Sequence, residues 1–222
     1  MNPNTMDKRE LSYWFEQKVN LNKKKSTIYG IGTDDSGYTS EIKVEGKLII
    51  CPVHQLWRSI IQRCYSEKFH RTNPTYRGTT VCREWLTFSN FKRWWVNNYK
   101  EGYQLDKDLL VLGNKTYSPE TCIFIPQWLN SFVTDSSSAR GKYLIGCNFD
   151  KANNKFKSRC CDPRTKKQHH IGYFDTELDA HLAWFHRKLD ILCELKSEID
   201  KIDYRLYDCV VLNIKMKTTT IK

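Results

Sequence analysis

The sequence has no run of about 18 apolar residues, the length that a membrane-spanning helix needs, so it predicts no transmembrane segment. Its first residues, MNPNTMDKRELSYW, lack the charged and then apolar pattern of a secretory signal peptide. We therefore expect a cytoplasmic protein with no membrane partner. In that compartment its nine cysteines should be reduced thiols.

Paired Cys-x-x-Cys motifs, which frame many structural zinc sites, are also absent. Cys51 and His54 have a ligand-like spacing, and Cys64, His70 and Cys82 would be the nearest further ligands. The spacing of those further ligands is irregular. Buried free thiols account for the cysteines better than zinc does, so we do not expect a zinc ion.

Acidic residues are too few to balance the basic ones: 25 Asp and Glu stand against 36 Lys and Arg, a net charge of +11. Such an excess attracts polyanions, most commonly nucleic acid, with a membrane surface as the rival. A basic protein without a polyanionic partner is the third reading. The chain carries 7 Trp, 12 Tyr and 10 Phe, which excludes a disordered tail, and 222 residues suffice for one large or two small domains.

Apolar periodicity predicts clear helices at residues 53–65 and 90–99, the second with Ser89 as its N-cap, and a shorter helix at 9–19. Alternating apolar residues on both sides of Glu45-Gly46 predict a β-hairpin across 41–50. The segment GIGTDDSG has two glycines but no helix after it, so it predicts a turn and not a dinucleotide-binding loop.

Residues 105–132 predict a strand–strand–helix unit. Its first strand is expected to include residues 109–112, followed by a turn at 113–115 and a second strand at 121–125. Pro126 stands where a helix start tolerates proline, so the helix should follow it.

After a polar linker at 134–141, the pattern predicts three strands at 142–149, 155–161 and 167–174. Thr176 to Asp179 reads as a capping box for the next helix. Five apolar residues of that helix form a stripe expected to dock on the sheet: Leu178, Leu182, Phe185, Leu189 and Leu192. A further helix from Glu198 should end in frayed residues, KMKTTTIK.

Cations gather in this C-terminal part. Lys155, Lys157 and Arg159 alternate along one strand and so share a face, while Phe156 points to the other. Three more cations lie on or beside the neighbouring strands: Lys142, Lys166 and Lys167. A cationic sheet backed by one helix suits a DNA groove, which makes these six residues candidate DNA contacts. The alternative is a small α+β domain with solvated charges.

The central region resembles HNH endonucleases of the phage homing type. The resemblance covers roughly residues 50–132 and is carried by a combination of motifs: WRSIIQRCYS at 57–66, PTY at 74–76, VCREW at 81–85, DKD at 106–108, YSPETC at 117–122 and Asn130. It implies a ββα fold holding one Mg²⁺, for which Mn²⁺ would substitute. Asp106 and Asn130 match the ligand positions, and Asp108 would add a second carboxylate.

The resemblance is imperfect at the catalytic position, because Lys107 stands where the family has its general-base histidine. Lysine has an ordinary pKa of about 10.4 and is a poor base at neutral pH. With Asp106, Lys107 and Asp108 as catalytic candidates, the site would be slow, would rely on the metal alone to activate water, or would be inactive. Asp106 and Asp108 are equally compatible with solvated carboxylates flanking a turn.

Residues 141–196 are similar to the APETALA2/ethylene-response DNA-binding domain. Tyr143 and Gly146, FKS at 156–158 and IGYFDT at 171–176 carry this second resemblance. It implies that the three-stranded sheet contacts double-stranded DNA. Homing endonucleases of phages often carry such a domain at one end.

Together these observations predict an α+β protein with a ββα-metal (HNH-like) central unit and a three-stranded antiparallel sheet backed by one helix. The expected domains are a hairpin-containing segment at 1–50, the HNH-like domain at 51–133, the linker at 134–141 and the APETALA2-like domain with a helical tail at 142–222. The expected function is metal-dependent cleavage or nicking of DNA in the cytosol of a phage host. The alternatives are an inactive scaffold that regulates through DNA binding, and an inhibitor of a host protein.

Overall fold

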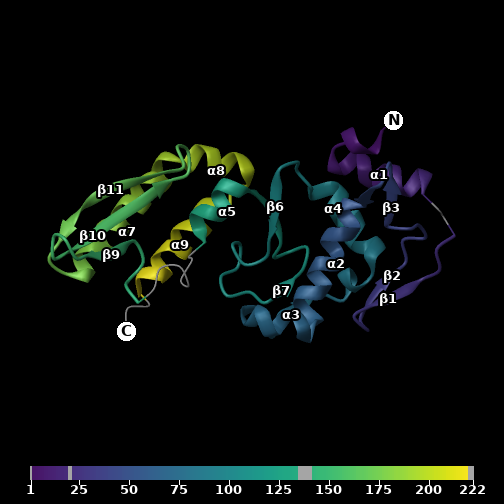
Figure 1. Cartoon of the computed structure of the whole chain (residues 1–222), viewed down its shortest axis with the longest axis horizontal. Helices are drawn as coiled ribbons and strands as arrows, with labels where there is room; N and C mark the ends of the chain where they lie inside the picture. Colours follow the sequence, from purple (N-terminus) through teal and green to yellow (C-terminus); the bar gives the residue numbers. More distant parts are fainter. Residues whose placement is uncertain (1, 20–21, 135–141, 220–222) are drawn as a thin grey trace. The chain divides into compact units, whose positions relative to one another are not determined.

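The computed structural model describes residues 2–19, 22–134 and 142–219 (Figure 1). The protein is α+β and consists of two compact units. The first unit comprises Met1–Asp108 and Gly113–Phe124, and the second comprises Leu109–Leu112 and Ile125–Lys222. Across the described residues, no helix combines the length and apolar character needed to cross a membrane.

The boundary between the units differs from the expected domain boundaries. Helix α5 (Gln127–Val133) packs on α9 and buries Leu129 and Phe132, so it belongs to the second core and not to the central region. The expected N-terminal segment is likewise no separate part, because Phe15 and Tyr38 are buried in the first core. Residues 135–141 of the expected linker lie outside the described residues.

The helices of the first unit follow the sequence signals. Asp7 and Glu10 form a capping box at the start of α1, and Pro52 occupies the first turn of α2, where its missing N–H costs nothing. The apolar face predicted for α2 is buried, including Trp57 and Ile61. The helical segments are η1 (Pro3–Thr5), α1 (Lys8–Lys18), α2 (Pro52–Tyr65), α3 (Glu67–Thr72), η2 (Pro74–Tyr76), η3 (Glu84–Leu86) and α4 (Phe88–Asn98).

The predicted cap of α4 is wrong. The helix begins at Phe88 with Thr87 as its N-cap, so Ser89 lies inside the first turn. Ser89 instead donates its backbone N–H and its hydroxyl to the two carboxylate oxygens of Asp35, at 2.9 and 2.7 Å. The Asp35 carboxylate, from a distant loop, thus accepts a backbone N–H of the first turn that an N-cap side chain would otherwise have bonded.

The strands of the first unit form small pairs. The hairpin of β3 (Glu41–Val44) and β4 (Lys47–Ile50) confirms the prediction, and both turn residues, Glu45 and Gly46, have positive φ. The segment predicted only as a turn carries a second hairpin of β1 (Ser26–Ile28) and β2 (Gly32–Asp34). β5 (Thr80–Val81) pairs in parallel with β7 (Thr116–Tyr117), far along the chain.

The strand–strand–helix order is present, with a different first strand. β6 (Tyr103–Asp106) pairs with β8 (Ile123–Pro126), and α5 follows β8 directly. Residues 109–112 were expected in the first strand but form bends. Leu109 is buried while Val111 is half exposed, so the apolar run marks a packed loop and not a paired strand.

The second unit is a three-stranded antiparallel sheet in the order β11-β10-β9 with helix α7 packed on all three strands (Figure 1). This confirms the sheet-and-helix prediction. The bounds are β9 (Cys147–Asp150), β10 (Lys155–Asp162), β11 (Lys167–Phe174), α7 (Glu177–Glu194), α8 (Lys196–Ile202) and α9 (Leu206–Thr219). Because Val210 and Ile214 are buried, the tail stays helical through Thr219 where fraying was expected.

The first strand of the sheet is shorter than predicted because α7 binds the chain before it. The Glu177 carboxylate accepts the N–H of Leu144 at 2.5 Å, and His181 Nδ1 lies 2.7 Å from the carbonyl oxygen of Ile145. Backbone groups engaged by a helix in this way are not available for a sheet. β9 therefore begins only at Cys147.

The capping of α7 by Thr176, which accepts the N–H of Asp179, is confirmed. The predicted apolar stripe is not. Leu178 is 46% exposed, and only Leu192 of the five predicted residues is buried. The buried face is rotated and consists of Ala180, His181, Trp184, Lys188, Ile191 and Leu192.

Lys188 is the unexpected member of that face. It is only 8% exposed, and its Nζ lies 3.6 Å from the centre of the Phe132 ring on α5. Burial is the main reason that the pKa of Lys188 is lowered to about 8, and the nearby charge of Lys217 contributes to that shift. The ammonium group rests on an aromatic face and not on a carboxylate.

Candidate nucleic-acid interface

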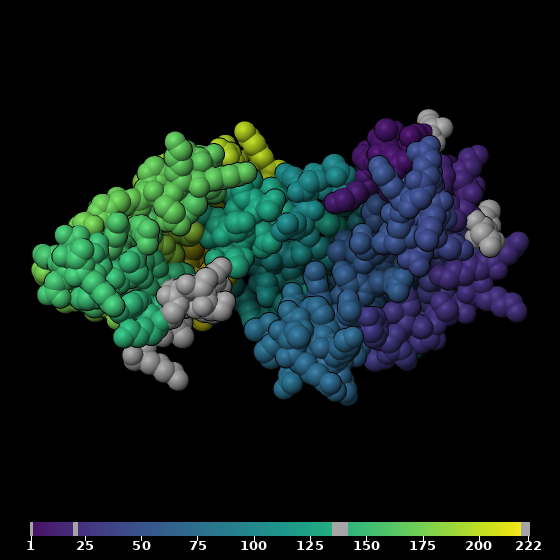
Figure 2. Space-filling view, viewed as in Figure 1, coloured from purple at the N-terminus to yellow at the C-terminus, as the bar shows by residue number. Residues whose placement is uncertain are grey.

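The sheet of the second unit has one covered face and one open face. Ser158, Cys160 and Asp162 of β10 are buried on the side of α7. Because side chains alternate along a strand, Lys155, Lys157 and Arg159 point to the opposite side. In the view of Figure 2 the green strands of the sheet lie in front of most of the helical segment behind them. The predicted cationic face therefore exists, and the helix leaves it uncovered.

The register adds residues from the neighbouring strands to this open face. Residues directly paired in an antiparallel sheet share a face, and Lys157 is paired with Asn148 on β9 and with Tyr173 on β11. Arg159 is paired with His170 across a β-bulge that follows Ser158. Lys155 is paired with Asp150 on β9. The open face is defined here as Asn148, Asp150, Lys155, Lys157, Arg159, His170 and Tyr173.

Contacts within the open face hold its cations in place. Arg159 donates from Nη2 to Asn148 Oδ1 at 3.0 Å, and Lys157 Nζ lies 5.6 Å from the centre of the Tyr173 ring. The ring of His170 lies 4.8 Å from that of Tyr173. A guanidinium, an ammonium and two rings thus lie side by side, with the carboxylate of Asp150 paired opposite Lys155. Lys155 differs, because Asp175 pairs with it at 3.1 Å at the margin of the face.

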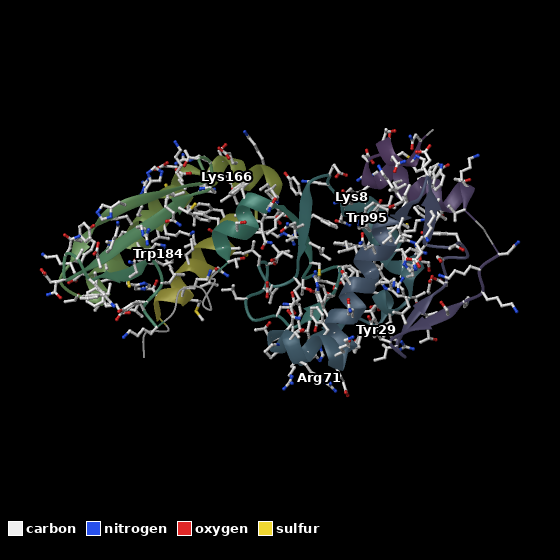
Figure 3. All side chains as sticks on the ribbon, in the orientation of Figure 1. Lys8, Tyr29, Arg71, Trp95, Lys166 and Trp184 are labelled. Carbon is white, nitrogen blue, oxygen red and sulfur yellow. The ribbon has the colours of Figure 1, made fainter. Side chains whose placement is uncertain are left out.

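The other three predicted DNA contacts lie elsewhere. Lys166 occupies the turn between β10 and β11 with a φ of 57° (Figure 3). Lys167 is paired with buried Asp162, which places it on the side of α7. Lys142 lies over the ring of Tyr143, which packs on Phe156, also on the helix side. The six cations therefore do not form one surface.

Sequence reasoning missed Asn148, His170 and Tyr173. The alternation along β10 was visible in the sequence, but the partners of β10 depend on the register, and the bulge shifts that register by one residue. The sequence did show an aromatic residue, Tyr173, in the segment HHIGYF. In the structure this tyrosine is 40% exposed.

The predicted catalytic residues lie in a loop of the first unit, at the end of β6. Asp106 Oδ1 accepts the N–H of Asp108 at 3.0 Å, which closes a tight turn. Lys107 Nζ donates to Asp108 Oδ2 at 2.8 Å and to the carbonyl oxygen of Asn114 at 3.4 Å. The Lys107 side chain is 13% exposed and lies over the ring of Tyr117. Through these contacts Lys107 stabilises the conformation of the loop.

Asn130, the third predicted metal ligand, lies in α5 and belongs to the second unit. Asp106 and Asp108 belong to the first. Within the first unit the two carboxylates share one turn, and Mg²⁺ is often held by one or two carboxylates together with water and substrate phosphate. Carboxylate oxygens are hard donors of the kind that Mg²⁺ takes, and here Asp108 also pairs with the Lys107 ammonium at 2.8 Å. Residues 2–19, 22–134 and 142–219 contain no group of three or more His, Cys, Asp or Glu residues placed to hold a metal.

The residues considered for zinc have other partners. His54 Nε2 lies 2.9 Å from Asp34 Oδ2, and His70 Nε2 lies 2.7 Å from the carbonyl oxygen of Arg63. Burial raises the pKa of the Cys64 thiol to about 12, which disfavours the thiolate that binds metals. All nine cysteines lie in the described part of the chain, and each is a free thiol.

A buried ion cluster in the first unit was not predicted. Asp34 is bound by His54, by the ammonium of Lys23 and by the N–H of Ser36. Burial alone would raise the pKa of Asp34, but these hydrogen bonds lower it far below its usual range. Asp34 ends β2, so the cluster fixes the base of the β1–β2 hairpin to α2.

Comparison with protein families, curated proteins and solved structures found no match to the chain.

Proposed function

We propose that the protein binds double-stranded DNA through the open face of its sheet. The observation that carries the proposal is the projection of Lys155, Lys157 and Arg159 from alternate positions of β10, on the side that α7 leaves uncovered. The overall charge of +11 gives the chain the long-range attraction that such binding needs.

The chemistry of the open face suits both parts of DNA recognition. Lysine ammonium groups neutralise phosphates and position the protein. Arginine presents paired donors that match the acceptors of guanine, and asparagine presents a donor and an acceptor that match adenine. Arg159 and Asn148 are already bound to each other and so are oriented together. A sheet of three short strands is narrow enough to enter a major groove.

Binding should weaken steeply as salt is added. Three cationic contacts release about three counterions, so the logarithm of the association constant should fall with the logarithm of salt concentration with a slope of about −3. Fluorescence anisotropy of a labelled duplex, titrated at several salt concentrations, measures that slope. A slope near zero, or no binding at low salt, contradicts the proposal.

A second candidate function is metal-dependent hydrolysis of DNA, as in endonucleases of the phage homing type. It is favoured by the order β6, β8, α5 and by the carboxylate of Asp106 at the end of β6. A bound Mg²⁺ would stabilise the negative charge that develops on the phosphate. In this chain Asp106 and Asp108 would hold the ion. Lys107 donates a hydrogen bond to Asp108 and so would orient that carboxylate.

Asp106→Ala should reduce nicking of supercoiled plasmid in Mg²⁺ about 10²-fold, because several kcal/mol of charge stabilisation depend on the ion's carboxylate anchor. Wild type and variant should bind DNA equally. Asp190→Ala, which removes an exposed carboxylate from α7, serves as the control and should nick as wild type does. Equal nicking by wild type in Mg²⁺ and in EDTA would contradict the candidate function.

The two alternatives predict different outcomes. A non-catalytic regulator binds DNA through the open face and does not nick it with Mg²⁺ or Mn²⁺. Inhibition of a host protein was expected from the aromatic-rich central region, but Trp57, Trp85 and Trp95 are all buried in the first core. Those three rings offer no surface to a partner, and inhibition of a host protein stays a third, weaker alternative.

A further inference from the structure

The β1–β2 hairpin of the first unit projects two apolar side chains into solvent. Tyr29, labelled in Figure 3, is 46% exposed, and Ile31, on the other side of Gly30 in the sequence, is 42% exposed. Tyr29 has a φ of 51°, in the left-handed region that glycine and asparagine adopt far more readily than tyrosine. The ring therefore occupies a strained position without being buried.

The base of the hairpin is fixed rigidly. A Cβ at Gly32 would lie 3.2 Å from the Trp57 ring, so β2 runs in close contact with α2. Two residues further on, buried Asp34 is held by His54 and Lys23. A tip anchored by a buried ion cluster and a close helix contact is presented in one orientation, which lowers the entropy lost on binding.

The exposed charges beside the hairpin are positive. Lys24 and Lys25 precede β1 and are both exposed. The two carboxylates at the end of β2 are already engaged, since Asp34 is buried in its ion cluster and Asp35 accepts both hydrogen bonds of Ser89. An apolar tip flanked by exposed lysines is complementary to a polyanion with an apolar interior.

We infer that the β1–β2 hairpin is a second DNA-contacting element, which places Tyr29 and Ile31 against base pairs in the minor groove while Lys24 and Lys25 contact the flanking phosphates. The inference rests on the proposed function, because it takes DNA as the ligand, but it concerns the other unit and a different surface. Proteins that bind the minor groove commonly insert apolar side chains between base steps and bend the duplex.

Bending gives a readout that electrostatic attachment alone would not change. A duplex shorter than its persistence length of about 150 base pairs closes into a circle poorly unless a protein bends it. We expect the wild-type chain to raise the yield of ligated circles from such a fragment. The double variant Tyr29→Asn with Ile31→Asn should lose that increase and bind DNA about tenfold more weakly, the loss typical of one stacked ring.

The substitutions are chosen so that the fold survives. Asparagine tolerates the positive φ of position 29, and both side chains are exposed, so the melting temperature should not fall. Leu48→Asn removes another exposed apolar side chain, from the β3–β4 hairpin of the same unit, and should leave circle formation unchanged. An equal loss in Leu48→Asn would overturn the assignment to the β1–β2 hairpin.

Failure of the inference is distinguishable from failure of the proposed function. If the wild type binds duplex DNA and the double variant forms circles equally well, the hairpin inference is overturned and the proposed function stands. If the wild type does not bind DNA at low salt, both are overturned. If Tyr29 is needed for sedimentation with phosphatidylserine vesicles and not for circle formation, the hairpin is a membrane contact and the inference is wrong.

Discussion

Replacing Gly146 with alanine is expected to lower the free energy of unfolding of the second unit by about 4 kcal/mol, a sum of backbone strain and overpacking. Gly146 has a φ of 84° and lies against α7. A Cβ there would lie 1.9 Å from Cγ of Trp184, closer than any real contact. Trp184 is buried and stacks on His181, so it has no easy alternative position.

Chemical denaturation followed by tryptophan fluorescence measures the loss. Gly102→Ala is the matched control, because Gly102 has a φ of 77° and open space where its Cβ would lie. It should cost only about 1–2 kcal/mol, the backbone part of the effect. Combining Gly146→Ala with Trp184→Ala should cost less than the sum of the two single changes, because the smaller side chain relieves the clash. Additive losses, or equal losses in Gly146→Ala and Gly102→Ala, would show that the close packing is not as described.

The triple change of Lys155, Lys157 and Arg159 to alanine is expected to weaken DNA binding about 10³-fold. Hydrogen bonds to charged groups are worth about 1.5 kcal/mol each, so three contacts amount to about 4 kcal/mol. The salt dependence should flatten at the same time, since fewer counterions are released. Fluorescence anisotropy of the labelled duplex measures both quantities. The fold should survive, because these side chains make surface contacts only.

A second triple variant separates the open face from net charge. Lys142, Lys166 and Lys167 belong to the same unit and carry the same total charge, but they lie in the turn or on the helix side. Changing all three to alanine should weaken binding about tenfold or less, through the long-range field alone. If both triple variants lose the same affinity, DNA is attracted by charge and not held by the open face.

Local signals predicted the elements that depend on neighbouring residues. The helices at 53–65 and 90–99 and the hairpin around Glu45-Gly46 follow from periodicity and from turn chemistry, which are properties of short segments. The three-stranded sheet followed from alternation and from the turns between its strands. The alternation along β10 also predicted which side of the strand carries Lys157 and Arg159.

Features that depend on distant partners were not predictable in this way. The stripe of leucines on α7 looked like the core-facing side, but Gly146 opens space for Trp184, which rotates the buried face. Ser89 looked like a cap because nothing in its own segment reveals Asp35 as its partner. The parallel pairing of β5 with β7 joins residues more than thirty positions apart, beyond any local pattern.

The candidate catalytic loop shows the same limit. The motif DKD was visible, but its geometry depends on Asn114 and Tyr117, which hold Lys107 from the far side of the loop. The three predicted metal ligands lie in two units of this chain, Asp106 and Asp108 in the first and Asn130 in the second. A motif specifies which residues are present, whereas the positions of its members are set by the packing of the elements that carry them.

Lys188 couples the folding of the second unit to proton release. Its pKa is about 8 in the folded chain, against an ordinary value of about 10.4 for lysine, so between these values the unfolded chain holds a proton that the folded chain has given up. Stability from this group therefore rises with pH across that window and is lowest below it. At neutral pH the unit folds around a charge that it would be more stable without. Lys188 thus lowers the free energy of unfolding of this unit at neutral pH. An uncharged side chain of the same length would remove that loss of stability.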